Sequence, residues 1–369
     1  MVWSASVSSG LWAYVSLGKG DGTFYPAQGG QLHTGSFGAD PNLYSKLMGD
    51  FNGDGLTDLA WSATAVSGVW MYVALGKGDG TFYPAQGGQL HSGSFGSDSN
   101  LYAKLPADFN GDGVTDMVWS ATNSAGVWTY VSINGSIVSD RLSRIVNGSE
   151  IKRTIMYKPL TDKAAYTKDT AGTASSYPKL DIQAPMYVVS SVSASNGAGG
   201  TVTTNYKYGG LKAELGTGRG MLGFRWLEAT QAETGIVTRT EFKQDWPYTG
   251  LVSKTQKSLA GAGNNGVLSQ VDNTYGCTDF VSSTGCTTGV GKRYYVYASQ
   301  STESSWDVNG AALPTIITAS QYDIWGNATQ VSVSSSDGYS KVTTNSFSND
   351  VGNWYLGRLN KASVTSTVP

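Results

Sequence analysis

Apolar residues in the first third of the chain occur in short runs of strand length, separated by polar, glycine-rich turns. The run "GVWMYVAL", from Gly68 to Leu75, is rich in the aromatic and β-branched residues that favour strands. It is followed by the turn "GKGDG", where Asp79-Gly80 supplies positive φ, and then by "TFYPA". No segment of useful length has apolar residues at helical spacing. The pattern predicts an all-β chain.

This pattern repeats every 58 residues. The segment "GKGDGTFYPAQGGQLH" begins at Gly18 and returns unchanged at Gly76. Three sets of aromatic residues keep the same register: Trp3, Trp61 and Trp119; Trp12, Trp70 and Trp128; Tyr14, Tyr72 and Tyr130. A fixed period of this size predicts one β-unit stacked on copies of itself, and several short strands per unit predict a propeller blade. Two full units and the tail of another predict a partial propeller.

Each repeat also carries an acidic loop, "DFNGDGLTD" and then "DFNGDGVTD". Side-chain oxygens stand at loop positions 1, 3, 5 and 9, a backbone carbonyl can face inward at position 7, and glycines allow sharp turns between them. The candidate ligands are Asp50, Asn52, Asp54, Leu56 and Asp58 in the first loop and Asp108, Asn110, Asp112, Val114 and Asp116 in the second. Such oxygen sets suit calcium, and the crowded carboxylates would repel one another without a cation. The alternative is an Asx-rich turn without metal.

Composition narrows the class of protein. Glycine accounts for 48 of 369 residues, about twice its usual share, while charged residues make up 14% and aromatic residues 11%. This is typical of an extracellular, turn-rich β-protein and not of a disordered chain. A net charge of −2 without a Lys/Arg cluster argues against nucleic acid as a partner. No apolar run approaches the length of a membrane span.

Two cysteines and one glycine motif need separate interpretation. Cys277 and Cys286 flank a Gly- and Ser-rich turn, which favours a disulfide that closes a hairpin, with two reduced thiols as the alternative. Gly218, Gly220 and Gly223 match G-x-G-x-x-G, but a dinucleotide site needs a helix after the motif. The residues that follow instead predict a β-hairpin that turns at Thr234-Gly235.

Catalytic residues are not indicated. His33 and His91 occupy equivalent positions in the repeat, which favours a structural role, and no partnered Ser/His/Asp set is visible. We therefore expect no enzyme activity. The Trp–Tyr pairs two residues apart, such as Trp70 and Tyr72, share one face of a strand. They are interpreted as core between blades, with platforms for sugar rings as the alternative.

The repeat resembles the FG-GAP/VCBS repeats of integrin-type β-propellers, whose D-x-D-x-D-G-x-x-D loops hold calcium. The segment "GRGMLGFRWLEATQAETGIVTRTEFKQDWPYTGL" (218–251) resembles the one that follows the propeller in the B component of Tc toxins and in related plasmid-virulence proteins. The segment "QYDIWGNATQVSVSSSDG" (321–338) resembles a YD repeat of Rhs proteins, and "FSNDVGNWYLGRLNKASVT" (347–365) resembles the motif just before the main Rhs shell. The resemblance implies incomplete propeller blades in 1–135, a linking β-domain in 136–260, and the start of an Rhs-type antiparallel β-sheet shell in 261–369.

The resemblance also implies a function. In this family a hollow shell encloses a toxic C-terminal segment and the propeller docks a translocating component, so we expect a structural, secreted bacterial protein whose partners include other parts of a larger parent chain. The alternative is a calcium-dependent adhesin or glycan-binding propeller. The opening "MVWSASVSSG" matches the end of a repeat, so we expect a further acidic loop upstream in the parent. A strand edge within residues 2–17 would then either self-associate or be covered.

Overall fold

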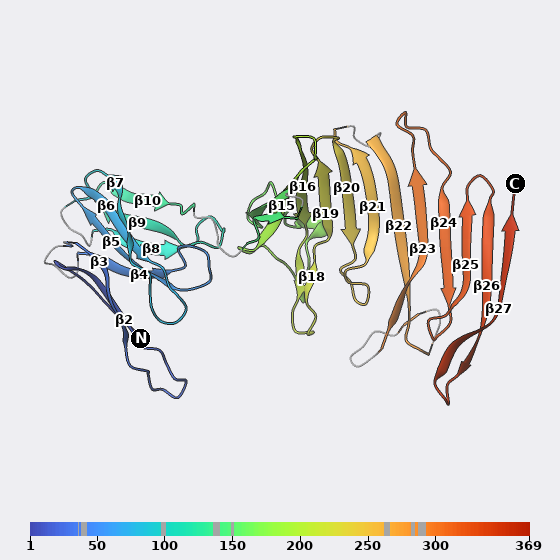
Figure 1. The fold of residues 1–369 in the computed structure, drawn as a ribbon, viewed down its shortest axis with the longest axis horizontal. Coiled ribbons are helices and arrows are strands. Elements are labelled where there is room, and N and C mark those ends of the chain that lie inside the picture. The colour runs from blue at the N-terminus through green and yellow to red at the C-terminus, as the bar shows by residue number, and fades with distance from the viewer. Residues whose placement is uncertain are drawn as a thin grey trace. The chain divides into compact units, whose positions relative to one another are not determined.

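The structure is a computed structural model, and it describes the whole chain except residues 36, 38–42, 97–100, 136–140, 149–150, 262–265, 282–284 and 287–292. Among the residues described, the regular structure comprises twenty-seven strands and one short 3-10 helix, η1 (Ala171–Thr173), which confirms the all-β prediction (Figure 1). The chain divides into two compact units, Met1–Leu142 and Ser143–Pro369. Among the residues described, no helix is long and apolar enough to cross a membrane.

The first unit contains three antiparallel sheets, here called the first, second and third sheet. The first consists of β1 (Val2–Val7), β2 (Gly10–Val15) and β3 (Gln28–Thr34). The second consists of β4 (Ser45–Gly49), β5 (Asp58–Ala65), β6 (Gly68–Ala74) and β7 (Gln86–Ser92). The third consists of β8 (Ala103–Ala107), β9 (Asp116–Asn123) and β10 (Gly126–Ser132). The run predicted as a strand from Gly68 is therefore β6.

The sheets follow the 58-residue period. Strands β1, β5 and β9 are equivalent, as are β2, β6 and β10. In each sheet a tryptophan of the first of these strands lies opposite a tyrosine of the second: Trp3 and Tyr14, Trp61 and Tyr72, Trp119 and Tyr130. The four-stranded second sheet shows one complete unit. Its first strand, β4, lies before the acidic loop that begins at Asp50. A sheet therefore begins earlier in the chain than a sequence repeat that is counted from Asp50.

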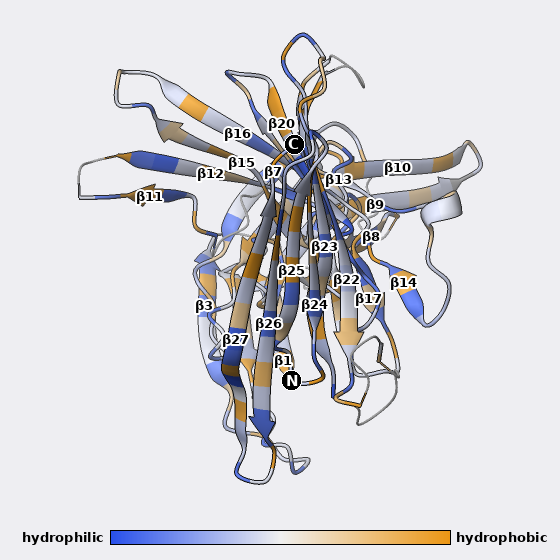
Figure 2. Cartoon of the chain, turned by 90° about the vertical axis from the view of Figure 1, so that its right-hand side faces the viewer, coloured by the Kyte–Doolittle hydropathy of each residue, from blue (hydrophilic) through white to orange (hydrophobic). Residues whose placement is uncertain are grey.

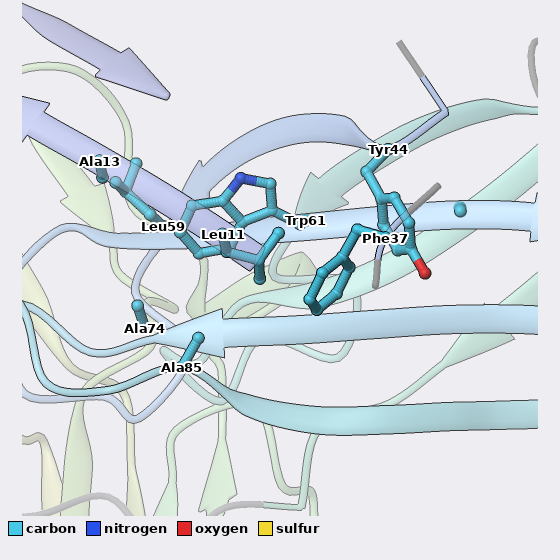
Figure 3. Packing of buried hydrophobic residues seen from close by; sticks show 9 residues of the cluster. Leu11, Ala13, Phe37, Tyr44, Leu59, Trp61, Ala74 and Ala85 are labelled. Carbon is cyan, nitrogen blue, oxygen red and sulfur yellow. The ribbon is translucent and has the colours of Figure 1, made fainter. Parts of the chain in front are cut away.

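Two hydrophobic cores hold the three sheets together. The core at the first junction, between the first and second sheets, includes Leu11 from β2 and Leu59 and Trp61 from β5 (Figure 3). The core at the second junction, between the second and third sheets, includes Met71 from β6 and Trp119 from β9. Within the second sheet, Trp61 and Met71 point to opposite faces, because Met71 pairs with Ser62, the neighbour of Trp61, and neighbouring residues of a strand point to opposite sides.

One hydrogen bond recurs at both junctions and fixes the register between sheets. Trp61 Nε1 donates to Ser4 Oγ (2.8 Å), and Trp119 Nε1 donates to Ser62 Oγ (3.0 Å). Both tryptophans are buried, so each indole N–H needs such a partner. The same pair of residue types, 58 positions apart, therefore repeats the same contact between sheets.

The second unit is built on one 14-stranded sheet, antiparallel except that β13 pairs with β16 in parallel. Its strands are β11 (Arg144–Val146), β12 (Lys152–Pro159), β13 (Tyr166–Thr167), β15 (Tyr187–Ser195), β16 (Thr201–Gly209), β19 (Trp226–Gln231), β20 (Ile236–Phe242), β21 (Val252–Leu259), β22 (Val267–Thr278), β23 (Tyr295–Ser305), β24 (Ile316–Tyr322), β25 (Ala328–Ser335), β26 (Ser340–Asp350) and β27 (Tyr355–Thr367). A small separate sheet contains β14 (Lys179–Asp181), β17 (Lys212–Glu214) and β18 (Gly220–Gly223).

Buried apolar residues gather near the start of this unit and are scarce further along it. One core cluster contains Leu160, Tyr166, Tyr208 and Leu211. Among the described residues of β20–β27, only Cys277 and Thr278 are buried. Polar and apolar residues are mixed along β25, β26 and β27 (Figure 2). From β20 onward, ladder hydrogen bonds and cross-strand pairs therefore hold the sheet more than a core does.

A buried ion network ties the small sheet to the start of the long one. Arg225 binds Asp169 with two hydrogen bonds, Nε to Oδ2 at 2.9 Å and Nη2 to Oδ1 at 2.6 Å. Lys212 Nζ lies 3.3 Å from Asp169 Oδ2 and 3.4 Å from Asp181 Oδ1. Gly210 leaves room for this network, since a Cβ there would lie 2.6 Å from Asp169 Oδ2.

Several sequence predictions for this unit can be compared with the structure. The hairpin at Thr234-Gly235 is confirmed, because β19 pairs with β20 across a turn in which Gly235 has φ 69°. The disulfide between Cys277 and Cys286 is also confirmed. The proposed boundary between 260 and 261 falls between β21 and β22, which are neighbours in the same sheet. The division into three parts, 1–135, 136–260 and 261–369, stays a prediction.

Candidate functional site

The two acidic loops have the same backbone arrangement. The first connects β4 to β5, and Asp50 Oδ1 accepts the N–H groups of Gly53 (2.7 Å) and Asp54 (3.1 Å) while its Oδ2 accepts that of Gly55 (2.8 Å). In the second loop, Asp108 accepts the corresponding three N–H groups, from Gly111, Asp112 and Gly113. Gly53 and Gly55 have φ of 73° and 80°, which other residues rarely adopt. The glycines therefore let each loop wrap around its first aspartate.

The last aspartate of each loop is buried at the start of a strand. Asp58 Oδ2 accepts the N–H of Phe51 (2.7 Å) and its Oδ1 accepts the N–H of Gly76 (2.8 Å). Burial raises the pKa of Asp58, the two N–H donors lower it, and the negative charges of Asp54 and Asp50 raise it again, leaving it above its ordinary value. A positive charge in this loop would relieve that repulsion.

The middle positions are also held by hydrogen bonds within the loop. Asn52 Nδ2 donates to Asp54 Oδ2 (2.9 Å), and Leu56 N–H donates to Asp54 Oδ1 (2.8 Å). The second loop repeats both contacts with Asn110, Asp112 and Val114 at 3.0 and 2.9 Å. The structure thus brings all ten predicted residues into two matching loops.

The donor chemistry of these loops suits calcium, which binds carboxylate, amide and carbonyl oxygens. In the part of the chain that the structure describes, no group of three or more His, Cys, Asp or Glu side chains is placed to hold a metal ion. The carboxylates instead accept N–H groups, as an Asx-rich turn does. Calcium binding at Asp50–Asp58 and Asp108–Asp116 therefore stays a prediction.

Three residues that support these loops were not found from the sequence. Thr115 joins the loops, because Asp50 N–H donates to Thr115 Oγ1 (2.9 Å) and Thr115 N–H donates to Asp50 O (2.7 Å). Asn134 N–H donates to Asp116 Oδ1 (2.8 Å), as Gly76 N–H does to Asp58. Gly76 and Asn134 are 58 residues apart, so the repeat places them at equivalent positions. Because their side chains differ, a comparison of residue types did not identify them as equivalent.

The repeated histidines and aromatic pairs have structural surroundings. His33 contacts the rings of Phe37 and Tyr72, and His91 makes the equivalent contacts with Phe95 and Tyr130. Tyr72 and Trp70 pack on the core of the first junction, and Tyr130 packs on that of the second. The interpretation of these pairs as core between sheets therefore holds for Trp70, Tyr72 and Tyr130.

Family comparisons match the region of both loops and the start of the second unit. Residues 50–119 match the FG-GAP-like repeat, and residues 97–250 match the insecticide toxin TcdB middle/N-terminal region. The first match starts at Asp50 and contains both acidic loops. No curated protein matches the sequence.

Solved structures show the same fold over nearly the whole chain. TcdB2–TccC3 with Cdc42 matches 98% of the chain with a TM-score of 0.65 at 13% identity. TcdB2–TccC3 without its hypervariable C-terminal region matches equally at 12% identity. In both cases the chain spans 21% of the length of the matched chain. A lectin from Agrocybe aegerita, in a structure describing recognition of non-reducing terminal N-acetylglucosamine, has a TM-score of only 0.24 at 11% identity.

These findings confirm the resemblance to FG-GAP repeats and to Tc toxin B components. The family matches cover β5–β10 of the stacked sheets and the start of the long sheet, and the fold match extends to the rest of the chain. The chain therefore combines an FG-GAP-like repeat with a TcdB-type middle/N-terminal region, and its fold is similar to that of TcdB2, the B component of a Tc toxin.

Proposed function

We propose that this chain is a non-enzymatic structural part of a secreted bacterial toxin-delivery protein of the Rhs/Tc type. In this proposal the first unit is part of a calcium-stabilised β-propeller, and the second is an Rhs/YD-type shell segment that encloses or docks a toxin. The observation that carries it is the 14-stranded sheet within a fold similar to TcdB2.

The burial of the long sheet supports the role of a shell wall. From β20 to β27 the described strands bury only Cys277 and Thr278, although antiparallel sheets usually pack one face on a core. A long sheet that buries so few residues can form the wall of a shell, with one face toward the enclosed space and the other toward the outside. The strands also follow one another in chain order from β19 to β27, as a wall built strand by strand requires.

The stacked sheets support the role of propeller blades. The second sheet has four antiparallel strands, and it packs against a neighbour on each face with the same Trp–Ser hydrogen bond. Radial repetition of such four-stranded units is the architecture of a propeller.

Calcium is the cation that the acidic loops fit best by donor type. Its binding would offset the charges that raise the pKa of Asp58 in the first loop. The matching hydrogen bonds of Asp50 and Asp108 support equal occupancy, so elemental analysis is expected to find two calcium ions per chain.

Secretion is supported by the disulfide between Cys277 and Cys286, because such bonds persist in oxidising compartments. The expected partner is a TccC3-type component, since TcdB2 is found with TccC3 in the matched structures.

A segment exchange tests the structural role. We expect a TcdB2 hybrid, in which this chain replaces the corresponding segment, to co-purify with TccC3 and to protect it from protease. A hybrid that unfolds cooperatively but leaves TccC3 open to protease would contradict the proposal. Glycan binding by this chain without any protein partner would favour the adhesin alternative instead.

A further inference from the structure

One segment of the first unit packs on the core of the first junction. It comprises residues 82–86, Phe-Tyr-Pro-Ala-Gln, which lead into β7 and are called the plug segment here. Ala85 N–H donates to Leu32 O (2.8 Å), and His33 Nδ1 lies 3.1 Å from Ala85 O. Ala85 is 1% exposed and lies in the core with Leu11 and Ala74 (Figure 3), while Phe82 packs against that core.

Among the described residues, no segment occupies the equivalent position at the second junction. Leu90 and His91 stand 58 residues after Leu32 and His33. Leu32 and His33 are half-buried, whereas Leu90 is 50% exposed and His91 is exposed. Within the described residues, no backbone segment forms the counterparts of the two hydrogen bonds of Ala85 at Leu90 and His91. Leu90 and His91 therefore repeat the residues that bind Ala85, but no described segment binds them as the plug segment binds Leu32 and His33.

A pocket of about 660 Å³ lies at this position. It is lined by the apolar residues Val73, Leu90 and Met117 and by the polar residues Thr115 and Asn134, among others. At the first junction, a pocket of about 220 Å³ is lined by Val15 and Leu59, the equivalents of Val73 and Met117, and Phe82 is one of its walls. The larger pocket has the size and the mainly apolar lining of a binding site.

We propose that this pocket is a docking site for an extended segment of a partner polypeptide that has the pattern of the plug segment: an aromatic residue followed by proline and a small residue. The aromatic side chain enters beside Met117, as Phe82 does beside Leu59, and so extends the core already shared by the second and third sheets. The small residue lets the backbone approach Leu90 and His91 closely, and the backbone hydrogen bonds give the affinity.

A second copy of this chain is a poorer occupant. Residues 24–28 have the sequence of the plug segment, and Phe24 is 47% exposed. In the docked arrangement, however, the plug segment follows β6 directly. A folded copy that placed residues 24–28 in the pocket would bring its β2 to the position already occupied by β10. A partner segment without that neighbouring strand meets no such conflict.

The chain provides its own probe for this site. A fluorescent peptide with the sequence of residues 79–87 is expected to bind the intact protein saturably. Phe82→Ala in the peptide is expected to weaken binding at least tenfold. Leu90→Asp in the protein is expected to do the same, whereas the control Val127→Asp, at a 71% exposed position of β10 outside the pocket, is expected to leave binding unchanged.

Four results would overturn the proposal. Wild-type protein that does not bind the peptide, or that binds a scrambled peptide equally well, has no such site. Binding that appears only after residues 136–140 are replaced by Gly and Ser means that the chain itself fills the pocket. Self-association that both Phe24→Ala and Leu90→Asp abolish, measured by sedimentation, means that a second copy is the occupant.

Discussion

The two units of this chain are both built of β-strands, but they are stabilised differently. In the first unit, stacked sheets bury tryptophan, leucine and alanine in two cores, and Trp61 and Leu11 are fully buried. In the second unit, the described residues of the long sheet form one small core, near its start. The first unit thus depends on contacts between sheets, and the second on contacts along one sheet.

This difference shows what a repeated sequence provides. In the first unit the same residue types return at both junctions, so one sequence pattern produces the same contacts between sheets twice. The long sheet lacks this arrangement and relies instead on particular local ties. Two of these are the Asp169 network and the Cys277–Cys286 disulfide.

The largest expected effect comes from removing the central side chain of the first junction. Trp61→Ala deletes a fully buried indole and leaves Ser4 Oγ without its donor. We expect a loss of about 3–5 kcal/mol in the free energy of unfolding. Trp354→Ala in the second unit is the matched control, because Trp354 is 69% exposed, and it is expected to cost less than about 0.5 kcal/mol. Urea denaturation measures both. Similar losses for the two variants would refute the contrast between the units.

The second prediction concerns the ion network of the long-sheet unit. Burial raises the pKa of Asp169, but hydrogen bonds and positive charge from Arg225 and Lys212 outweigh it, so the pKa lies below the ordinary 3.8. A lowered carboxyl pKa stabilises the fold above the unfolded-state pKa, and this contribution is lost as the pH falls through the folded-state value. Asp169→Asn is expected to cost about 3 kcal/mol at pH 7, because two cations lose a buried partner.

The pH dependence separates this charge effect from a packing effect. Between pH 5 and pH 3, stability should fall more steeply in the wild type than in Asp169→Asn, so that the two curves converge. Asp337→Asn, at an exposed position, is the control and should follow the wild type at every pH. Parallel curves for wild type and Asp169→Asn would show that the charge of Asp169 does not contribute.

The third prediction is that calcium binds to the first unit and not to the second. At a free calcium concentration of one hundred times the Kd, binding stabilises the fold by about 2.7 kcal/mol per site. A chelator should therefore lower the thermal midpoint and speed amide exchange at Gly53 and Gly55, while β24–β26 exchange as before. Asp54→Ala and Asp112→Ala should each remove one calcium ion, and Asp79→Asn, outside the loops, should remove none. An unchanged midpoint in chelator, together with no calcium by elemental analysis, would exclude the site.

The extent to which the sequence predicted this structure differs between the units for a physical reason. The 58-residue period made the strands, the junction tryptophans and both acidic loops predictable, because each repeated contact requires the same residues at the same spacing. The network of Asp169, Lys212 and Arg225 left no such trace, since its members are up to 56 residues apart and occur once. Thr115 was also missed, because its role arises only when β4 and β9 are brought together.

The smallest expected effect concerns the disulfide of the long sheet. Cys277 is the second-last residue of β22 and Cys286 lies nine residues later, so the disulfide closes a short loop. Removing the bond therefore restores little freedom to the unfolded chain. We expect the double variant Cys277→Ser/Cys286→Ser to lose about 2 kcal/mol. Amide exchange should increase at the paired ends of β22 and β23, where Cys277 faces Val296, and should not change in the first unit. Alkylation of unreduced protein followed by mass spectrometry checks the bond itself. Two labelled thiols would show that it is absent, and the long sheet would then lack one of the local ties that distinguish it from the stacked sheets.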